Sequence, residues 1–308
     1  MFKTLKVGLK RWTTVLRDAG EYWLDSNAFA NAGALAFFTI FSMAPMMIMI
    51  VSVVGVFYGQ ETAQGEIAAK IQAAVGSKAA EAVEEAIARA RDQEDGLFAT
   101  LSGLGAMLIG ATTVFGQMQD SLNAIFGVAP KPSRSGVWLL IRKRLTSLTI
   151  VLAVGFVMLV SLSLSVVLRV VLQSMQEWIP WHDAAFSALD TGLSLAVAAL
   201  LFGTIIKTLP DVKLSWRNVL LGSLLTAAMF TVGRVLIALY LSVTATASTY
   251  GAAGSLVLLL LWVNYSSLIL LYGAAFVRAD LEHRGCVVQP ESVAVRVQRS
   301  IVEDLEGS

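Results

Sequence analysis

Charged residues are scarce in this sequence, and the residues that most often carry enzyme chemistry are scarcer still. Asp, Glu, Lys and Arg make up 15% of the 308 residues, whereas soluble domains usually carry about 25%. There are two histidines and one cysteine, Cys286, so an internal disulfide is excluded. No pair of His, Cys or carboxylate residues has metal-ligand spacing, and neither a nucleophile elbow nor a phosphate loop occurs. The sequence predicts no metal, no cofactor and no enzyme, although intramembrane hydrolysis by isolated polar groups stays open.

Apolar residues are abundant instead. They account for 56% of the chain, and the mean hydropathy is +0.70. About 20 apolar residues suffice to cross a bilayer. Six stretches are long enough: 32–57, 97–119, 146–172, 184–206, 218–243 and 251–277. The first is too long for a signal-peptide core of about 7–15 residues, and we interpret it as a retained span. We therefore predict an all-α, polytopic membrane protein with six transmembrane helices.

The distribution of positive charge orients these helices. Of the 23 Lys and Arg residues, 17 lie in the N-terminal segment, in the connections 127–144 and 207–217, or after residue 277. Four lie between residues 58 and 96, among eight Asp and Glu residues. Cytoplasmic loops carry the excess of Lys and Arg, so we expect both termini in the cytoplasm. The same rule explains the basic connection 131–144 without a nucleic-acid partner.

The segments outside the predicted spans divide the chain into regions. Residues 1–31 are expected to form an amphipathic cytoplasmic or interfacial segment, 32–277 the transmembrane domain, and 278–308 a cytoplasmic tail. One stripe of the first segment is apolar: Phe2, Leu5, Leu9, Trp12 and Leu16. This pattern favours a helix in the cytoplasmic headgroup layer, and packing onto the bundle is the alternative. The acidic segment 58–96 is expected to be an extracytoplasmic helical hairpin, or else a solvated loop.

Two arginines interrupt the apolar stretches. Arg234 lies about 13 Å below the outer end of the fifth predicted span, and Arg169 about 5 Å from the outer end of the third. An Arg near the bilayer centre costs at least about 2.5–3.5 kcal/mol, so it persists only beside protein, water or a counter-ion. Asp190 lies at a similar depth, about 9 Å below the outer end of the fourth span.

Two interpretations of these charges stay open. In the first, they line a polar cavity that opens to the outside and handles an anionic headgroup or a proton. In the second, Arg234 and Asp190 form an ion pair that holds two helices in register, while Arg169 extends to the outer interface.

Asn264 and Pro45 complete the candidate substrate or gating residues. Polar residues of this kind often make only inter-helix hydrogen bonds, and this alternative also covers Gln117, Gln119 and Asn123. Pro45, in FSMAPMMIMI, cannot donate to the carbonyl of Phe41, so the first span should kink. Small residues in the fifth span permit close helix approach: Gly222, Ser223, Thr226 and Ala227.

Four stretches of the sequence stand out together: GALAFFTIFSMAPMMIMI in the first predicted span, LNAIFGV after the second, LPDVKLSW before the fifth and STYGAAGSLVLLLLWVNYSSLILLYGA in the sixth. Together they resemble the YihY/BrkB family of bacterial inner-membrane proteins. The resemblance implies six spans with cytoplasmic ends and roles in the cell envelope, including proposed export of lipids or lipopolysaccharide precursors. Some members were labelled as ribonucleases, but no histidine-rich metal motif here supports that activity.

The resemblance also bears on two positions. A basic residue at the position of Arg234 resembles a family feature. Family members often end the sixth span with Gly-Ala-Glu, where this chain has Gly273-Ala274-Ala275, so a role for that acid is in doubt here.

We therefore expect an inner-membrane transporter or flippase-like protein for an amphipathic envelope substrate, with membrane lipids as partners, including an anionic amphipathic substrate. Three spans in each half would place any internal repeat in inverted topology. A non-transporting scaffold that binds partners through segment 58–96 or the tail is the alternative, and a membrane hydrolase is the third.

Overall fold

The structure is a computed structural model that describes residues 2–42, 113–131, 182–243 and 252–297. Within these ranges the chain forms six helices and one two-stranded antiparallel sheet. The predicted helical character is confirmed, whereas the sheet was not predicted. Segment 58–96, the third predicted span, Arg169 and Pro45 lie outside the described residues.

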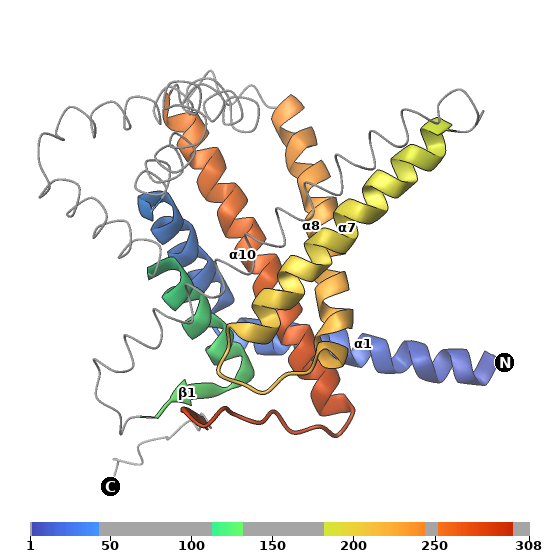
Figure 1. The fold of residues 1–308 in the computed structure, drawn as a ribbon, viewed down its shortest axis with the longest axis vertical. Coiled ribbons are helices and arrows are strands. Elements are labelled where there is room, and N and C mark those ends of the chain that lie inside the picture. Colours follow the sequence, from blue (N-terminus) through green and yellow to red (C-terminus); the bar gives the residue numbers. More distant parts are fainter. Residues whose placement is uncertain (1, 43–112, 132–181, 244–251, 298–308) are drawn as a thin grey trace, which may run out of the picture.

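Three long apolar helices form the described part of the bundle (Figure 1). They are α7 (His182–Thr208), α8 (Trp216–Val243) and α10 (Ala252–His283). In the described residues, these three are long and apolar enough to cross a membrane. They correspond to the fourth, fifth and sixth predicted spans, and α10 continues past the predicted end at 277. The total of six spans and their sidedness stay predictions.

Small residues set the distance between α8 and α10. A Cβ on Gly222 would overlap Val277, and a Cβ on Gly273 would overlap Thr226. Within lipid, helices gain little from the hydrophobic effect, and close approach of small residues supplies packing contacts instead. The predicted close approach of span five is therefore confirmed at Gly222 and Thr226.

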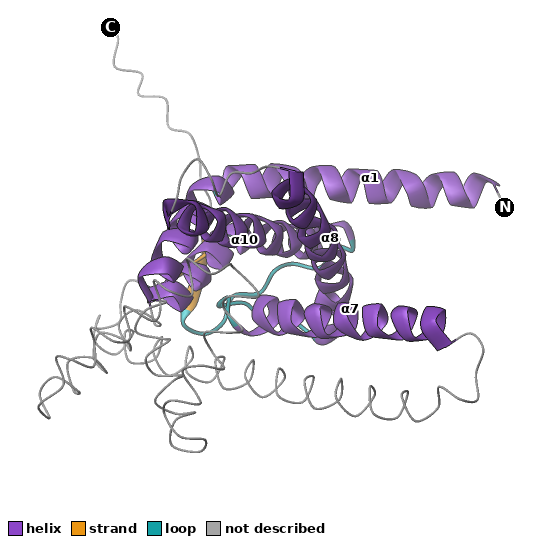
Figure 2. Cartoon of the chain, turned by 90° about the horizontal axis from the view of Figure 1, so that it is seen from above, coloured by secondary structure: helices purple, strands orange, loops and turns teal. Residues whose placement is uncertain are grey.

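The helices α7 and α8 cross and then separate. A Cβ on Gly203 would lie 3.2 Å from Ser223 Cβ, and the rings of Phe202 and Phe230 are 5.4 Å apart. Beyond this contact the helices diverge toward their His182 and Val243 ends, as Figures 1 and 2 both show.

Helix α1 (Phe2–Asp25) lies against α10, near the end of the bundle at which α7 and α8 are joined (Figures 1 and 2). It ends at a turn in which Asn27 has a φ of 55°, a left-handed conformation that asparagine tolerates. The chain then rises as a shorter apolar helix, Ala28–Ser42, which belongs to the first predicted span.

Residues 113–126 form a helix that ends at Gly127, whose φ is +66°, and leads into β1 (Val128–Pro130). The helix extends beyond the predicted end of the second span at 119. Strand β1 pairs antiparallel with β2 (Ala294–Arg296), with Ala129 opposite Val295.

The segment that follows α10 folds back under the bundle. We call residues 284–297 the C-terminal strap. Its backbone receives a hydrogen bond from Lys213 N to Gln289 O at 2.9 Å and donates one from Glu291 N to Asp211 O at 2.9 Å. Val297 N donates to Gly127 O at 2.8 Å. The strap therefore joins the α7–α8 loop to β1, and the described part of the predicted tail is packed rather than free.

The buried core gathers at this same end of the bundle. Its largest fully buried side chains come from most of the described helices: Phe126, Leu122, Ile125, Ile206, Leu209, Leu271, Val15, Val219 and Val277. Along its length, α8 exposes large apolar side chains, including Leu220, Leu224 and Val232. Exposed apolar surface of this extent is typical of a lipid-facing helix.

Candidate functional site

Arg234 lies on the side of α8 that faces α7. Ser223 and Phe230 both contact α7, and the helical repeat places Arg234 within about 40° of both. Arg234 is exposed and follows Phe230 by one helical turn, toward the Val243 end, at which α8 and α7 diverge (Figure 1). Val232, also exposed, lies about 180° from Ser223 around the helix.

Asp190, the predicted partner of Arg234, lies at a similar distance from the α7–α8 loop, but on a different side of α7 from the contact with α8. Asp190 is 18 residues from Thr208, and Arg234 is 18 residues from Trp216, so each lies about 27 Å along its helix from the shared loop. The backbone position of Asp190 is about 120° around α7 from Phe202. The side chain of Asp190 lies outside the described part of the structure, so the ion pair stays a prediction. Among the described carboxylates, none pairs with Arg234.

Asn264 faces the first apolar helix. A Cβ built on Gly33 would lie 3.9 Å from Asn264 Nδ2, so the amide stands at the contact between α10 and helix 28–42. On the next residue, Tyr265 packs against Gly233 of α8, and a Cβ there would overlap its ring. At residues 264 and 265, α10 therefore contacts helix 28–42 through Asn264 and α8, which carries Arg234, through Tyr265.

Of the other polar residues considered, Gln117 makes the expected inter-helix hydrogen bond, whereas Asn123 bonds to Asp211 in the loop between α7 and α8. Gln117 Nε2 donates to Asn31 Oδ1 at 3.4 Å. Asn123 Nδ2 donates to Asp211 Oδ2 at 2.9 Å, and Asp211 N donates to Asn123 Oδ1 at 2.8 Å. The last pair joins the two stretches LNAIFGV and LPDVKLSW that the sequence singled out.

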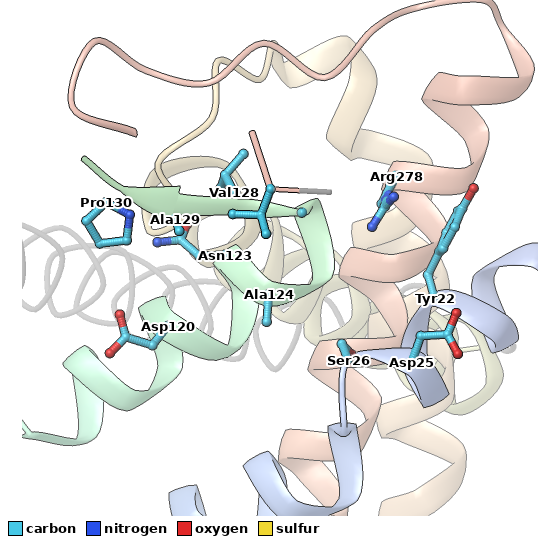
Figure 3. A pocket seen from close by; sticks show the side chains of 12 residues that line it. Tyr22, Asp25, Ser26, Asp120, Asn123, Ala124, Val128, Ala129, Pro130 and Arg278 are labelled. Atoms are coloured by element: carbon cyan, nitrogen blue, oxygen red, sulfur yellow. The ribbon is translucent and has the colours of Figure 1, made fainter. Parts of the chain in front are cut away.

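The structure also contains a pocket that the sequence did not predict. It has a volume of about 470 Å³ and lies near the base, between α1, helix 113–126, β1 and α10. Figure 3 shows Asp25 and Asp120 on opposite sides of it, with Ser26 and Ala124 between them. Two carboxylates at the wall of a pocket can accept hydrogen bonds from ammonium or hydroxyl groups.

Arg278 holds one wall of this pocket. Its Nη1 donates to Ile125 O at 2.6 Å, its Nε donates to Glu282 Oε1 at 3.0 Å, and its guanidinium lies 4.0 Å over the ring of Tyr22. The Tyr22 hydroxyl donates to Glu282. Burial, together with this hydrogen bond, raises the pKa of Tyr22 from its ordinary value to about 12. Arg278 thus ties α1, α10 and helix 113–126 together.

Sequence reasoning missed this pocket because its residues come from four separate segments with no common spacing. The available signal was the stretch LNAIFGV, which follows Asp120 and contains Asn123. Among the described residues, no group of three or more His, Cys, Asp or Glu side chains could hold a metal ion.

Comparison with known proteins finds several relatives of this chain. A protein of Saccharophagus degradans named UPF0761 membrane protein is 27% identical over 85% of this chain and 58% of its own length. One of Teredinibacter turnerae with the same name is 26% identical over 92% of this chain and 65% of its own length. A Bacillus subtilis protein, YfkH, is named as ribonuclease-like and is 27% identical over 56% of this chain. The chain spans about three-fifths of the length of these relatives, and no solved structure matches it.

A family model described as "Virulence factor BrkB" matches residues 21–292, from the end of α1 into the strap. This match covers most of the chain, includes all three long apolar helices and confirms the resemblance drawn from the motifs. The chain is therefore an integral membrane protein that belongs to the Virulence factor BrkB family.

Proposed function

We propose that the protein is a multi-pass inner-membrane transporter or flippase-like protein that moves an amphipathic envelope substrate with an anionic headgroup, such as a lipid or a lipopolysaccharide precursor. The observation that carries this proposal is the exposure of Arg234 on the α7 side of α8. A guanidinium at this depth is costly in hydrocarbon, and ionisable residues inside membrane helices commonly mark substrate or ion pathways. Arg234 binds the anionic headgroup, and no catalytic residue is required.

The location of Arg234 supports a path rather than a buried structural pair. An arginine that only held two helices together would stand where those helices touch. The α7–α8 contact is at Phe202 and Phe230, whereas Arg234 stands beyond it, where the helices diverge. The guanidinium, with its five donors, suits bidentate recognition of phosphate or carboxylate.

The opposite end of the same helices is joined by the strap. Backbone hydrogen bonds connect the strap to the α7–α8 loop and to β1. We take this arrangement as a form that is closed at the cytoplasmic end and open near Arg234 on the outer side. Alternating access, in which one end closes as the other opens, is the usual scheme of secondary transporters.

Reconstitution into vesicles tests the proposal. Short-chain fluorescent lipids with anionic or zwitterionic headgroups are placed in one leaflet, and their appearance in the other is followed. We expect wild-type protein to move anionic lipids at least tenfold faster than empty vesicles do. Arg234→Ala should lose most of this flux, and Arg234→Lys should keep part of it because the charge remains. Absence of flux for every headgroup would refute transport. Equal flux in wild type and Arg234→Ala would remove Arg234 from the mechanism.

A further inference from the structure

Helix α1 has two edges that differ in chemistry. With Leu16 taken as zero, Trp12, Gly20 and Trp23 all fall within about 40° of it around the helix. We call these four residues the lipid edge. In the sequence, the same register continues toward the N-terminus through further apolar positions: Phe2, Leu5 and Leu9.

The lipid edge contacts the apolar part of α10. The rings of Trp12 and Phe276 stack with centroids 6.1 Å apart. The Tyr272 hydroxyl donates to Leu16 O at 3.2 Å. These contacts fix α1 on α10, yet Trp12 and Leu16 keep 37% and 39% of their surface exposed. The lipid edge is therefore only partly covered by α10.

The opposite edge of α1 contacts the polar end of α10. Arg11 pairs with Asp280 at 3.4 Å, and the Asp280 side chain is only 2% exposed. Asp18 pairs with His283 at 2.7 Å. Arg11 and Asp18 lie about 140–160° around α1 from Leu16. Along α10 the contacts of α1 therefore change from apolar to charged between Phe276 and Asp280, which marks the boundary between membrane and water.

A second, independent feature marks the same boundary. Trp216, the first residue of α8, is 46% exposed, and the Lys207 ammonium at the end of α7 lies 5.1 Å over its ring. Trp beside a basic residue is typical of a membrane–water interface. Figure 1 shows the base of α8 at the level of α1.

The positive charge of α1 favours a bilayer surface that contains anionic lipid. Residues 2–17 contain five basic and no acidic residues. Of these, Arg17 lies about 100° from Leu16, on the side away from the α10 contact; its side chain is 76% exposed and pairs through Nε with the exposed Glu21 at 2.9 Å. Long basic side chains beside an apolar edge can reach lipid phosphates.

We propose that α1 is a membrane-binding surface, whose lipid edge inserts at the acyl–headgroup boundary of the leaflet at the strap end of the bundle and whose basic residues other than Arg11 bind the phosphates of anionic lipid. The apolar contacts with Phe276 and the polar contacts with Asp280 then fix the depth of the whole bundle. This surface does not depend on the proposed transport, because it involves neither Arg234 nor the pocket.

A pair of adjacent probes tests the surface in the full chain. Cys286 is replaced by Ser, a single cysteine is placed at Leu16→Cys or Arg17→Cys, and each variant is labelled with an environment-sensitive fluorophore in vesicles of phosphatidylcholine with or without phosphatidylglycerol. We expect a shallow lipid-borne quencher to reduce emission at position 16 at least twofold more than aqueous iodide does. Position 17 should show the reverse. Gly20→Cys is a second lipid-edge probe, since a Cβ there meets nothing within 4 Å.

The outcomes are distinct. Equal quenching by iodide at positions 16, 17 and 20 would place α1 in water and overturn the proposal. Protection of position 16 from both quenchers would show that protein, such as a second copy of the chain, covers this edge, and would also overturn it. Lipid quenching that rises with the fraction of phosphatidylglycerol supports the anionic preference, and quenching independent of it contradicts that preference.

Discussion

Thr226 and Gly273 touch where α8 crosses α10, and the contact leaves no room for a Cβ on the glycine. Thr226 Oγ1 donates to Gly222 O at 2.6 Å, so its hydroxyl is satisfied within its own helix. The side chain is fully buried against α10. The crossing of α8 and α10 is therefore set by Gly273 and Gly222, which leave room for Thr226 and Val277.

Replacing Gly273 by alanine should weaken this crossing. Gly273→Ala must push α8 away from α10 or force Thr226 into another rotamer, and such overpacking costs about 1–3 kcal/mol. We expect a clear fall in the thermal unfolding temperature of the detergent-solubilised protein. Gly192→Ala in α7 is the matched control, because a Cβ there meets nothing within 4 Å. Similar unfolding temperatures for the two variants would contradict the close contact.

Two hydrogen bonds join Asn123 and Asp211, and exchanging acid for amide at one position should affect stability differently from the reverse exchange at the other. Asp211→Asn keeps an acceptor for Asn123 Nδ2 and keeps its own backbone donor, so we expect little change. Asn123→Asp removes the donor and places two carboxylates together, which should cost about 2–3 kcal/mol. The readout is thermal unfolding, with limited proteolysis of the strap as a second measurement. Equal losses in both variants would show that the two side chains do not bond as described.

Alkaline pH should weaken the attachment of α1 to α10. The pKa of Tyr22 is raised from about 10 to about 12 in the folded protein, because the neutral hydroxyl is partly buried and donates to Glu282. A raised folded pKa contributes stability that is fully present below pH 10 and is lost as the pH rises from 10 to 12. Tyr22→Phe should remove about 1 kcal/mol at neutral pH and flatten this alkaline loss. The check is thermal unfolding between pH 8 and 12, and an unchanged alkaline slope in Tyr22→Phe would assign the loss to other groups.

Joining the strap to β1 should stop transport if the cytoplasmic end opens during the cycle. Ala129 and Val295 are opposite each other in the sheet, so Ala129→Cys with Val295→Cys, in a Cys286→Ser chain, can be cross-linked. We expect oxidation to reduce lipid flux severalfold and reduction to restore it. Single-cysteine variants treated in the same way serve as controls. Full flux after complete cross-linking would show that the strap is not a gate.

Much of the helical arrangement could be predicted because its cause is local. Each of α7, α8 and α10 contains a long, mostly apolar run, although Asp190 and Arg234 lie inside two of these helices. The extension of α10 to His283 was missed because charged residues signal the end of a span rather than the end of a helix. There the buried carboxylate of Asp280 pairs with Arg284 at 2.5 Å and with Arg11, which belongs to the distant helix α1.

The sheet, the strap and the pocket could not be predicted for a different reason. Strand β1 contains three residues, one of them Pro130, and its partner lies more than 160 residues away. No periodicity in so short a segment distinguishes a strand from a loop. For Arg234 the sequence gives its depth, whereas its direction toward α7 depends on contacts of Ser223 and Phe230 that only the structure supplies.

The most direct measurement is the accessibility of position 234 to water. In a Cys286→Ser chain, Arg234→Cys and Val232→Cys are treated with a membrane-impermeant thiol reagent applied from the outer side. The two positions are exposed but lie on opposite sides of α8. We predict that position 234 reacts readily and that position 232, facing lipid, reacts at least tenfold more slowly. Equal protection of both positions would contradict an outward-open path at Arg234, and with it the proposed role of this residue.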